Sequence, residues 1–400
     1  MAEYDVVIIG AGIVGLAAAR ELLRRKPALR LAIVEKEPEI GRHQTGHNSG
    51  VIHSGIYYAP GSLKAKACVA GAAQLYEYCE EKGIPFERCG KVIVASDDSE
   101  VPRLEELHRR GTANGVPGLE AVGPKRLREL EPHVVGVRGL WSPNTGIINY
   151  SQVAAAYADD VRSAGGEIRT SHAVVGLQSR GSERVVETTR GELTAGAVIA
   201  CAGLYADRVA ALSGASASPR IVPFRGDYYL LRPERRHLVR GMIYPVPDPA
   251  FPFLGVHLTR RIDGSVWLGP NAVLAFAREG YRRTDLAVRD VAEALGHRGF
   301  RRLATRYWKV GLAEMWRDVS KAAFCASLRV YMPELETSDL LPGPSGVRAQ
   351  ALSDDGALVD DFVVDRAGGI LHVRNAPSPA ATSSLAIGAM IADAYEHGDQ

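Results

Sequence analysis

The first stretch of the chain alternates between apolar runs and glycines. Residues 5–9 form a short β-branched run after one aspartate, as a buried parallel strand requires. Three spaced glycines follow, and residues 16–25 then carry alanine, leucine and arginine in a helical pattern. The stretch LRLAIVEKE, residues 29–37, is a second buried-strand pattern. The start of the chain is therefore predicted to form a strand–turn–helix–strand unit of an α/β sheet.

A similar pattern returns twice further along. Residues 191–212 combine a polar lead-in, an apolar strand, Gly203 and a helix, and residues 167–180 indicate a strand pair before them. Near the end, a proline-containing loop leads into an apolar helix predicted over 384–395. We expect these segments to join the first unit in one Rossmann-like, mixed α/β domain.

The segments between them have a different pattern. Residues 86–146 are charged and helix-rich, 219–269 indicate strands rich in Tyr, Val and Pro, and 284–332 return to helices. The Asp263-Gly264 pair is a hairpin signal between two of the strands. After Pro333 two short strands are expected. The predicted division is a discontinuous nucleotide-binding domain of residues 1–85, 147–217 and 338–400, and a sheet-plus-helices substrate-binding domain of residues 86–146 and 218–337.

Composition excludes several classes of protein. The 400 residues are 46% hydrophobic and 24% charged, which is typical of a folded globular chain. A net charge of +2 argues against a nucleic-acid binder. The five scattered cysteines form no CxxC pair, which favours a reducing, cytoplasmic compartment over a disulfide framework. The first strand begins too early for a signal peptide, and no apolar run is long enough for a membrane span.

The three glycines of the first turn form GxGxxG, at Gly10, Gly12 and Gly15. Gly10 permits the tight turn, Gly12 admits a pyrophosphate close to the backbone, and Gly15 lets helix and strand pack closely. The helix start adds amide donors for the phosphates. Glu35 ends the second strand, where its carboxylate can accept hydrogen bonds from ribose hydroxyls and repel a 2′-phosphate. The motif therefore predicts a dinucleotide other than NADP.

The loop that follows favours FAD over NAD. Residues 41–58, GRHQTGHNSGVIHSGIYY, replace the regular helix of a NAD dehydrogenase with a long polar segment that contains Thr45, Asn48 and Ser49. Such a loop can follow a long cofactor toward its reactive ring. The remaining residues that we predict to contact FAD are Lys36, Val174, Ala202, Gly203, Gly346, Pro377, Ala380, Ala381 and Thr382.

Several long motifs resemble one family throughout the chain. They include TGHNSGVIHSGIYY, VPFRGDYY, GPSGVRAQAL and HVRNAPSPAATSS, in this order. The chain is similar to the L-2-hydroxyglutarate oxidase/dehydrogenase family of the D-amino-acid-oxidase-like superfamily. The resemblance implies FAD-dependent oxidation of L-2-hydroxyglutarate to 2-oxoglutarate. It also implies transfer of electrons to a quinone-type acceptor or dioxygen, on the cytoplasmic face of a membrane.

The three histidines of the loop could bind a metal, serve as a base or only support the loop. Oxidation of a 2-hydroxy acid requires a base for the hydroxyl proton, and histidine suits this task near neutral pH. His53 follows the polar loop and is predicted to be this base, so that acidification should slow flavin reduction. His43 and His47 are expected to serve hydrogen bonds of the loop itself. Their spacing with His53 is not that of metal ligands, and no metal is predicted.

A substrate with two carboxylates requires cationic partners. Arg348, in a glycine-flanked loop, is predicted to bind one carboxylate through its planar fork. Arg225 is a weaker candidate, because the nearby Asp227 can neutralise it. His257 is a second candidate catalytic residue on a strand of the substrate-binding domain. Further predicted substrate contacts are Tyr228, Tyr244 and Asn271.

Two alternatives remain open from the sequence. The fold also suits oxidation of another 2-hydroxy acid or of an amino acid, and a flavin-binding interaction protein without turnover would share the cofactor motifs. The basic and aromatic stretch of residues 297–309 is expected to be a solvated helix face, or else a contact with an anionic membrane. The pattern makes no prediction about the oligomeric state.

Overall fold

The chain begins with the predicted strand–turn–helix–strand unit. A computed structural model describes residues 2–248 and 255–397. Strand β1 (Tyr4–Ile9) leads through the glycine turn into helix α1 (Ile13–Arg25), and β2 (Leu31–Val34) returns parallel to β1. Helix α1 turns its Ala and Leu side chains inward and leaves its arginines at the surface, which explains its orientation on the sheet.

The first sheet has eight strands in the order β10-β11-β12-β1-β2-β9, with β20 beside β12 and β19 beside β20. Pairs β1–β12, β2–β9 and β12–β20 are parallel. The added strands are β9 (Glu167–Arg169), β10 (Val174–Arg180), β11 (Glu183–Thr188), β12 (Gly191–Ala200), β19 (Val363–Ala367) and β20 (Ile370–Asn375). The strand pair expected over 167–180 is wrong in its pairing, because β9 and β10 end on opposite edges of the sheet. Which strands become neighbours across a parallel crossover cannot be predicted from the local sequence pattern.

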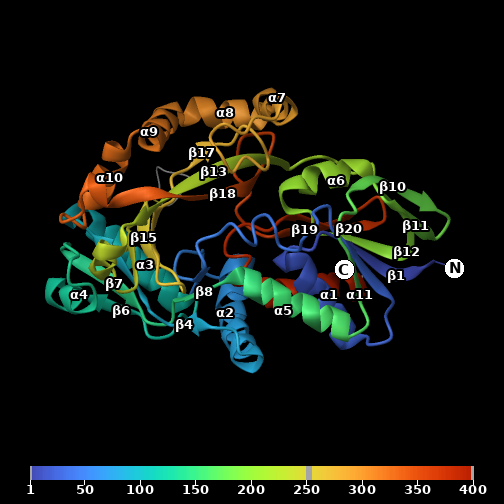
Figure 1. Cartoon of the computed structure of the whole chain (residues 1–400), viewed down its shortest axis with the longest axis horizontal. Coiled ribbons are helices and arrows are strands. Elements are labelled where there is room, and N and C mark those ends of the chain that lie inside the picture. Colours follow the sequence, from blue (N-terminus) through green and yellow to red (C-terminus); the bar gives the residue numbers. More distant parts are fainter. Residues whose placement is uncertain (1, 249–254, 398–400) are drawn as a thin grey trace.

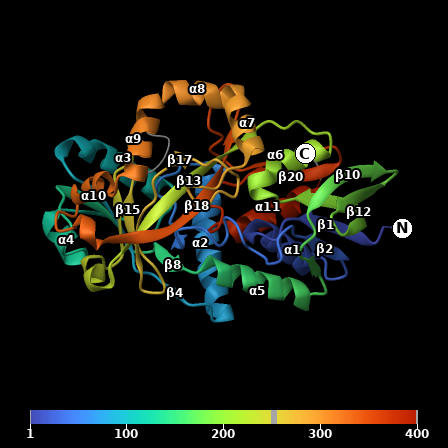
Figure 2. The same cartoon turned by 45° about the horizontal axis from the view of Figure 1, so that its top comes forward.

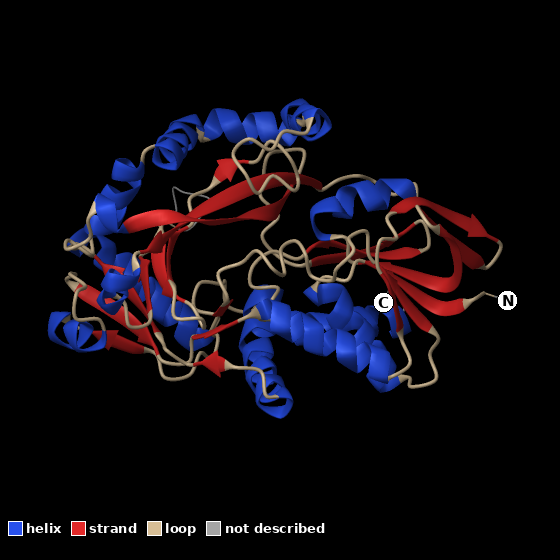
Figure 3. Cartoon of the chain, in the orientation of Figure 1, coloured by secondary structure: helices blue, strands red, loops and turns tan. Residues whose placement is uncertain are grey.

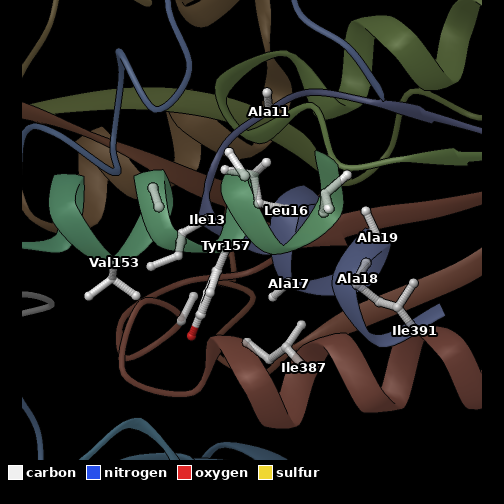
Figure 4. Packing of buried hydrophobic residues seen from close by; sticks show 14 of the residues in the cluster. Ala11, Ile13, Leu16, Ala17, Ala18, Ala19, Val153, Tyr157, Ile387 and Ile391 are labelled. Carbon is white, nitrogen blue, oxygen red and sulfur yellow. The ribbon is translucent and has the colours of Figure 1, made fainter. Parts of the chain in front are cut away.

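Helices cover both faces of this sheet (Figures 1 and 3). On one face lie α1, α2 (Leu63–Lys82), α5 (Tyr150–Ser163) and α11 (Ser384–His397), and on the other lies α6 (Ala206–Leu212). Figure 4 shows Leu16, Tyr157 and Ile387 meeting where α1, α5 and α11 pack. A side chain at Gly388 would contact the backbone of α1, so α1 and α11 cross closely. The apolar helix predicted over 384–395 is confirmed.

The second sheet has nine strands in the order β17-β13-β16-β15-β14-β5-β7-β6, with β18 along β13. Its strands are β5 (Lys91–Ala95), β6 (Glu120–Val122), β7 (Arg138–Ser142), β13 (Arg220–Leu231), β14 (Met242–Pro245), β15 (His257–Arg260), β16 (Val266–Gly269), β17 (Val273–Leu274) and β18 (Leu340–Leu352). A small third sheet joins β3 (Val51–Ile52), β8 (Gly146–Ile148) and β4 (Phe86–Glu87). The hairpin predicted at Asp263-Gly264 is confirmed, because β15 and β16 are antiparallel neighbours across this turn.

Six helices accompany the second sheet among the described residues. They are α3 (Val101–Ala113), α4 (Pro124–Leu130), α7 (Val288–Gly296), α8 (Arg298–Arg306), α9 (Trp308–Val319) and α10 (Lys321–Arg329), where helices were predicted. Strand β18 is longer than expected and pairs along β13, so residues 340–352 belong to the second sheet by pairing. The prediction had grouped them with the nucleotide-binding segments. The division into two domains stays a prediction.

Candidate active site

A cavity of about 1200 Å³ lies at the carboxyl ends of β1, β2 and β12 and extends to the strands of the second sheet. This is where an open α/β sheet binds its ligands. The predicted residues that line it are Gly10, Gly12, Glu35, Lys36, Thr45, Asn48, Ser49, His53, Val174, Ala202, Gly203, Tyr228, Tyr244, His257, Gly346, Arg348, Pro377, Ala380, Ala381 and Thr382. Three predicted residues lie outside its wall, namely Gly15, Arg225 and Asn271.

The glycine turn shows why each glycine is needed. Gly10 has a φ of +102°, and a Cβ there would lie 2.5 Å from the carbonyl oxygen of Cys201. A Cβ at Gly15 would lie 2.1 Å from the carbonyl oxygen of Gly10. A Cβ at Gly12 would meet only Thr45 Oγ1, at 3.5 Å. The fold itself therefore requires Gly10 and Gly15, whereas the side of Gly12 that opens to the cavity is left for a ligand.

The carboxylate of Glu35 is buried at the end of β2. It accepts hydrogen bonds from the backbone N–H of Ala11 at 2.8 Å and of Glu37 at 3.0 Å. These bonds fix the carboxylate on the cavity wall and leave lone pairs for a ribose. Thr45 Oγ1 accepts from the N–H of Ile13 at 3.0 Å, and Asn48 bonds the loop backbone. The polar loop is thereby anchored to the start of α1.

Lys36 lines the cavity, as expected of a cofactor contact, but its ammonium is also engaged by protein side chains. Its ammonium contacts the carboxylates of Glu37 and Glu279 and lies 2.8 Å from His43 Nε2. Among the described residues, Glu37, His43 and Glu279 are the group close enough to share a metal ion. The lysine already supplies their positive charge, so this cluster is an ion-pair network at the cavity rim.

The three loop histidines occupy different settings. His43 Nδ1 lies 2.9 Å from the hydroxyl of Tyr281, and His47 Nδ1 donates to the carbonyl of Ser345 at 2.9 Å while its ring stacks on Tyr281. Only His53 is held with an enclosed ring nitrogen, Nδ1, that has no hydrogen-bond partner in residues 2–248 and 255–397. Its backbone N–H donates to Thr382 Oγ1 at 3.1 Å, which ties it to the last loop before α11.

His53 and His257 are both held in the neutral form. Burial lowers the pKa of His53 to about 3, and the charges of Lys91, His257 and Lys64 act in the same direction. Burial also lowers the pKa of His257 to about 3, assisted by Arg348 and Lys91. His257 Nδ1 lies 3.0 Å from the carbonyl of Gly255, which can only accept, so Nδ1 carries the proton and Nε2 is left as an acceptor.

Residues from the second sheet complete the cavity opposite the loop. Tyr244, on β14, stacks on His257 of β15 with ring centroids 3.9 Å apart. Arg348 lies on β18 opposite Phe224 and lines the cavity. Burial raises the pKa of the Tyr228 hydroxyl, and the positive charge of Arg348 acts to lower it. An arginine, a neutral histidine and two tyrosines therefore share one end of the site.

The structure does not bring Arg225 and Asn271 into this group. The Arg225 guanidinium donates to Asp227 at 3.0 Å and to Asp318 at 3.4 Å. Asn271 accepts from the N–H of Asp227 at 2.7 Å and donates to Asp318 at 2.7 Å. Both side chains stabilise a buried network that joins β13 to the end of α9. Neither side chain lines the cavity.

Sequence reasoning missed four residues at this end of the cavity. Tyr57, Tyr58 and Lys64 line it, and the ammonium of Lys91 lies against the ring of Tyr57. The first two stand inside the loop motif, four and five residues after His53, and could have been included. The sequence indicated little about Lys91, which is a lysine at the start of an apolar strand. Its position depends on the pairing of β5 with β14.

Comparison with known proteins decides the family. The family model described as FAD dependent oxidoreductase, DAO, matches residues 5–394. The chain belongs to the DAO family of FAD-dependent oxidoreductases. A DAO-family member requires room for FAD. Here the open side of Gly12, the Glu35 carboxylate and the amides at the start of α1 suit its ribose and pyrophosphate.

Relatives of this DAO-family chain include proteins from animals and bacteria. It is 54% identical to "L-2-hydroxyglutarate dehydrogenase, mitochondrial" of Nematostella vectensis, over 98% of this chain and 90% of the relative. It is 52% identical to the Homo sapiens protein of the same name, over 98% and 88%. It is 46% identical to the "L-2-hydroxyglutarate dehydrogenase" of Indibacter alkaliphilus, over 98% of each chain.

Solved structures share the DAO fold at lower identity. The L-alpha-glycerophosphate oxidase of Mycoplasma pneumoniae, solved with FAD bound, superposes with a TM-score of 0.79 at 23% identity, covering 98% of this chain and 94% of that one. The glycine oxidase of Geobacillus kaustophilus gives 0.71 at 19% identity, covering 100% and 96%. These likenesses support the fold alone.

Proposed function

We propose that the chain oxidises L-2-hydroxyglutarate to 2-oxoglutarate with FAD. The observation that carries this proposal is the identity of 46–54% over 98% of the chain to three proteins named for that activity. The site chemistry supports it independently. A neutral histidine, His53, and an arginine, Arg348, line the same cavity as Glu35, the residue expected to bind the ribose of FAD.

The reaction removes a hydride from the second carbon and a proton from its hydroxyl, so that a carbonyl forms. When bound, FAD supplies the acceptor for the hydride. His53, which burial keeps unprotonated at neutral pH, accepts the hydroxyl proton through a ring nitrogen. The hydrogen bond from the His53 backbone N–H to Thr382 Oγ1 holds this residue beside the loop that leads into α11. His257 donates its Nδ1 proton in a hydrogen bond to the carbonyl of Gly255, so its Nε2 is left as a hydrogen-bond acceptor.

Arg348 binds the carboxylate next to the reacting carbon. It comes from β18, whose long pairing with β13 holds it rigidly. A planar guanidinium suits a carboxylate because two parallel N–H donors match two oxygens. Binding this carboxylate would place the hydroxyl between the arginine and the two histidines.

A turnover panel tests the substrate assignment. The purified holoenzyme is assayed with an artificial dye acceptor and with L-2-hydroxyglutarate, D-2-hydroxyglutarate, L-malate and L-glutamate. We expect the highest kcat/KM with L-2-hydroxyglutarate. A preference for L-glutamate would favour the amino-acid alternative, and no turnover with any of them would overturn the proposal.

The electron acceptor is a further part of the proposal. We propose a quinone-type acceptor reached at the surface of an anionic, cytoplasmic-side membrane, with dioxygen as a slow substitute. Figures 1 and 2 show α7, α8 and α9 as an outer row beyond β13 and β18. On α9 only Asp318 is buried, and one stripe of large apolar side chains faces outward. The stripe consists of Trp308, Leu312, Met315, Trp316 and Val319, each 55–67% exposed.

The charge around this stripe suits an anionic bilayer. Four exposed arginines precede it without an interspersed acid, namely Arg298, Arg301, Arg302 and Arg306, and the exposed Lys309 directly follows its first residue. Apolar side chains with flanking cations are typical of helices that lie in a lipid interface. No helix within the described ranges has the length and apolar character of a membrane span. All five cysteines are free, which suits a reducing compartment.

Vesicle binding tests the membrane proposal. Wild type should sediment with vesicles that contain phosphatidylglycerol and less with pure phosphatidylcholine vesicles, and added salt should weaken binding. The double variant L312S/W316S should lose binding while keeping dye-linked turnover. The control V135S removes an exposed apolar side chain that lies outside α9 and outside the cavity wall. Equal binding by both variants would contradict the assignment of α9.

A further inference from the structure

Lys91 is a buried lysine at the head of a central strand. It is the first residue of β5, paired in register with Met242 of β14 and Ser142 of β7. The residue is 1% exposed. Lysine is almost never fully buried unless it is paired, so its position requires an explanation.

The ammonium of Lys91 is held by two aromatic rings. Its Nζ lies 4.6 Å from the ring centroid of Tyr57 and 5.0 Å from that of Tyr244, and both rings line the cavity. In residues 2–248 and 255–397 no carboxylate pairs with it. Lys64, in contrast, bonds Asp360 at 2.9 Å. Lys91 is therefore a buried cation whose only described partners are π-faces.

Other polar groups around Lys91 also lack partners. The enclosed Tyr57 hydroxyl and His53 Nδ1 have no hydrogen-bond partner in the described part of the chain. Buried polar atoms are normally satisfied, so a cluster of unsatisfied ones beside a cavity indicates a polar ligand. The titratable groups that face Lys91 are His53, Tyr57, Cys68, Tyr244 and His257.

The charge of Lys91 is costly because the ammonium is buried. Burial lowers its pKa to about 7, because few groups compensate the ammonium. An anion bound nearby would restore that compensation. A 2-hydroxy dicarboxylate brings two negative charges, and Arg348 can balance one of them.

We propose that Lys91 supplies the positive charge that balances the second carboxylate of the substrate. It acts as a specificity-determining residue from behind the rings of Tyr57 and Tyr244, so that the cavity prefers a dianion to a monoanion. This inference rests on the proposed oxidation of L-2-hydroxyglutarate.

Two substrates separate this role from a structural one. L-2-hydroxyglutarate and L-2-hydroxyvalerate share a five-carbon skeleton, but the second has a methyl group in place of the remote carboxylate. In K91M, kcat/KM for L-2-hydroxyglutarate should fall about 10- to 100-fold through KM, the range of one charge-assisted interaction. The value for L-2-hydroxyvalerate should stay within about threefold, since a monoanion does not use this charge. K91R should recover part of the loss, and K66M, which removes an exposed charge from α2, should match wild type.

The pH profile gives a second readout. In wild type, kcat/KM for L-2-hydroxyglutarate should fall as pH rises above about 7, because the Lys91 amine then loses its proton. K91M should lack this fall. Flavin content measured by absorbance verifies that each variant is folded and loaded.

Three results would overturn the proposal. K91M could lose activity equally with both substrates, which would assign Lys91 to folding alone. It could retain the wild-type preference for the dianion. K64M could abolish that preference in place of K91M, which would transfer the role to Lys64. A wild-type enzyme with no preference for L-2-hydroxyglutarate would instead refute the proposed function itself.

Discussion

His53 combines three properties that a base for a 2-hydroxy acid needs. It lines the cavity, it is unprotonated at neutral pH, and its enclosed Nδ1 is unsatisfied among the described residues. Burial is the main reason that it is neutral, and its positive neighbours, which act in the same direction, also attract an anionic substrate. The charges of Lys91 and Lys64 therefore favour the neutral form of His53 and also attract the substrate.

Replacing His53 should slow flavin reduction while FAD stays bound. A positioned base contributes about 10²–10⁴-fold, so H53N should lose a factor in this range in the anaerobic reductive half-reaction. Stopped-flow absorbance with L-2-hydroxyglutarate measures it. Reduction within about threefold of wild type would exclude His53 as the base, and a larger loss in H257N would assign the role to His257.

The rate of flavin reduction should not change as the pH is lowered below neutrality. A histidine with an ordinary pKa would be protonated on acidification and would slow the reaction, as the sequence suggested. With a pKa of about 3, His53 stays neutral down to about pH 5, so flavin reduction should be constant between about pH 5 and 7. A wild-type rate that falls with a midpoint near the ordinary histidine value would contradict this environment.

Glu35 should control FAD affinity. E35A removes a carboxylate available to the ribose hydroxyls and leaves the N–H groups of Ala11 and Glu37 without their acceptor. A charge-assisted hydrogen bond contributes about 1.5–3 kcal/mol, so the Kd for FAD should rise at least about tenfold. Fluorescence titration of apoenzyme measures it. The control E39Q alters an exposed ion pair nearby, and equal Kd values for both variants would contradict the assignment.

Residues near each other in sequence were easier to predict than residues brought together by folding. The Gly10, Glu35 and His53 positions follow from local motifs, and all three line the cavity. Arg225 was recognised as weakened by Asp227, but its second partner, Asp318, lies on α9 and leaves no sequence signal. Lys91 reaches the site only through long-range strand pairing.

At the scale of elements, the turn between β1 and α1 separates folding from binding. G15A would force a Cβ against the Gly10 carbonyl at 2.1 Å and should destabilise the protein by more than about 1 kcal/mol. G12A meets only Thr45 Oγ1 within the protein, and its φ of −75° is allowed for alanine. G12A should keep the apoenzyme Tm and weaken FAD binding.

Thermal unfolding of the apoenzyme and FAD titration compare the two glycine variants. Equal loss of Tm in both would show that Gly12 is also required by the fold. The element order itself was largely predictable, since apolar runs and helical spacing mark β1, α1 and α11. The partners of β9, β10 and β18 were not, because pairing depends on the crossovers between distant segments.

At the scale of the whole molecule, a buried ion-pair network connects the row of outer helices to the first sheet. Arg278 is fully buried and donates to Asp207 of α6 at 2.8 Å and to the carbonyl of Leu204 at 2.6 Å. Asp290 of α7 accepts from the N–H of Arg278 at 2.7 Å. This network holds the segment before α7 against the region that also forms the FAD cavity.

Breaking this network should lower stability strongly. R278M leaves the Asp207 carboxylate buried without its partner, which costs about 3–5 kcal/mol. The midpoint of denaturant unfolding should fall clearly, whereas R109M, which removes an exposed i,i+3 pair on α3, should change it little. Similar midpoints for both variants would mean that the segment is held by other contacts.

The most direct test of the whole account is a single turnover in the absence of oxygen. Purified holoenzyme is mixed with L-2-hydroxyglutarate, its D-enantiomer or L-glutamate, and flavin absorbance and 2-oxoglutarate are measured together. The L-enantiomer alone should bleach the flavin, with one 2-oxoglutarate formed for each flavin reduced. Flavin that stays oxidised with L-2-hydroxyglutarate, or that L-glutamate reduces faster, would contradict it.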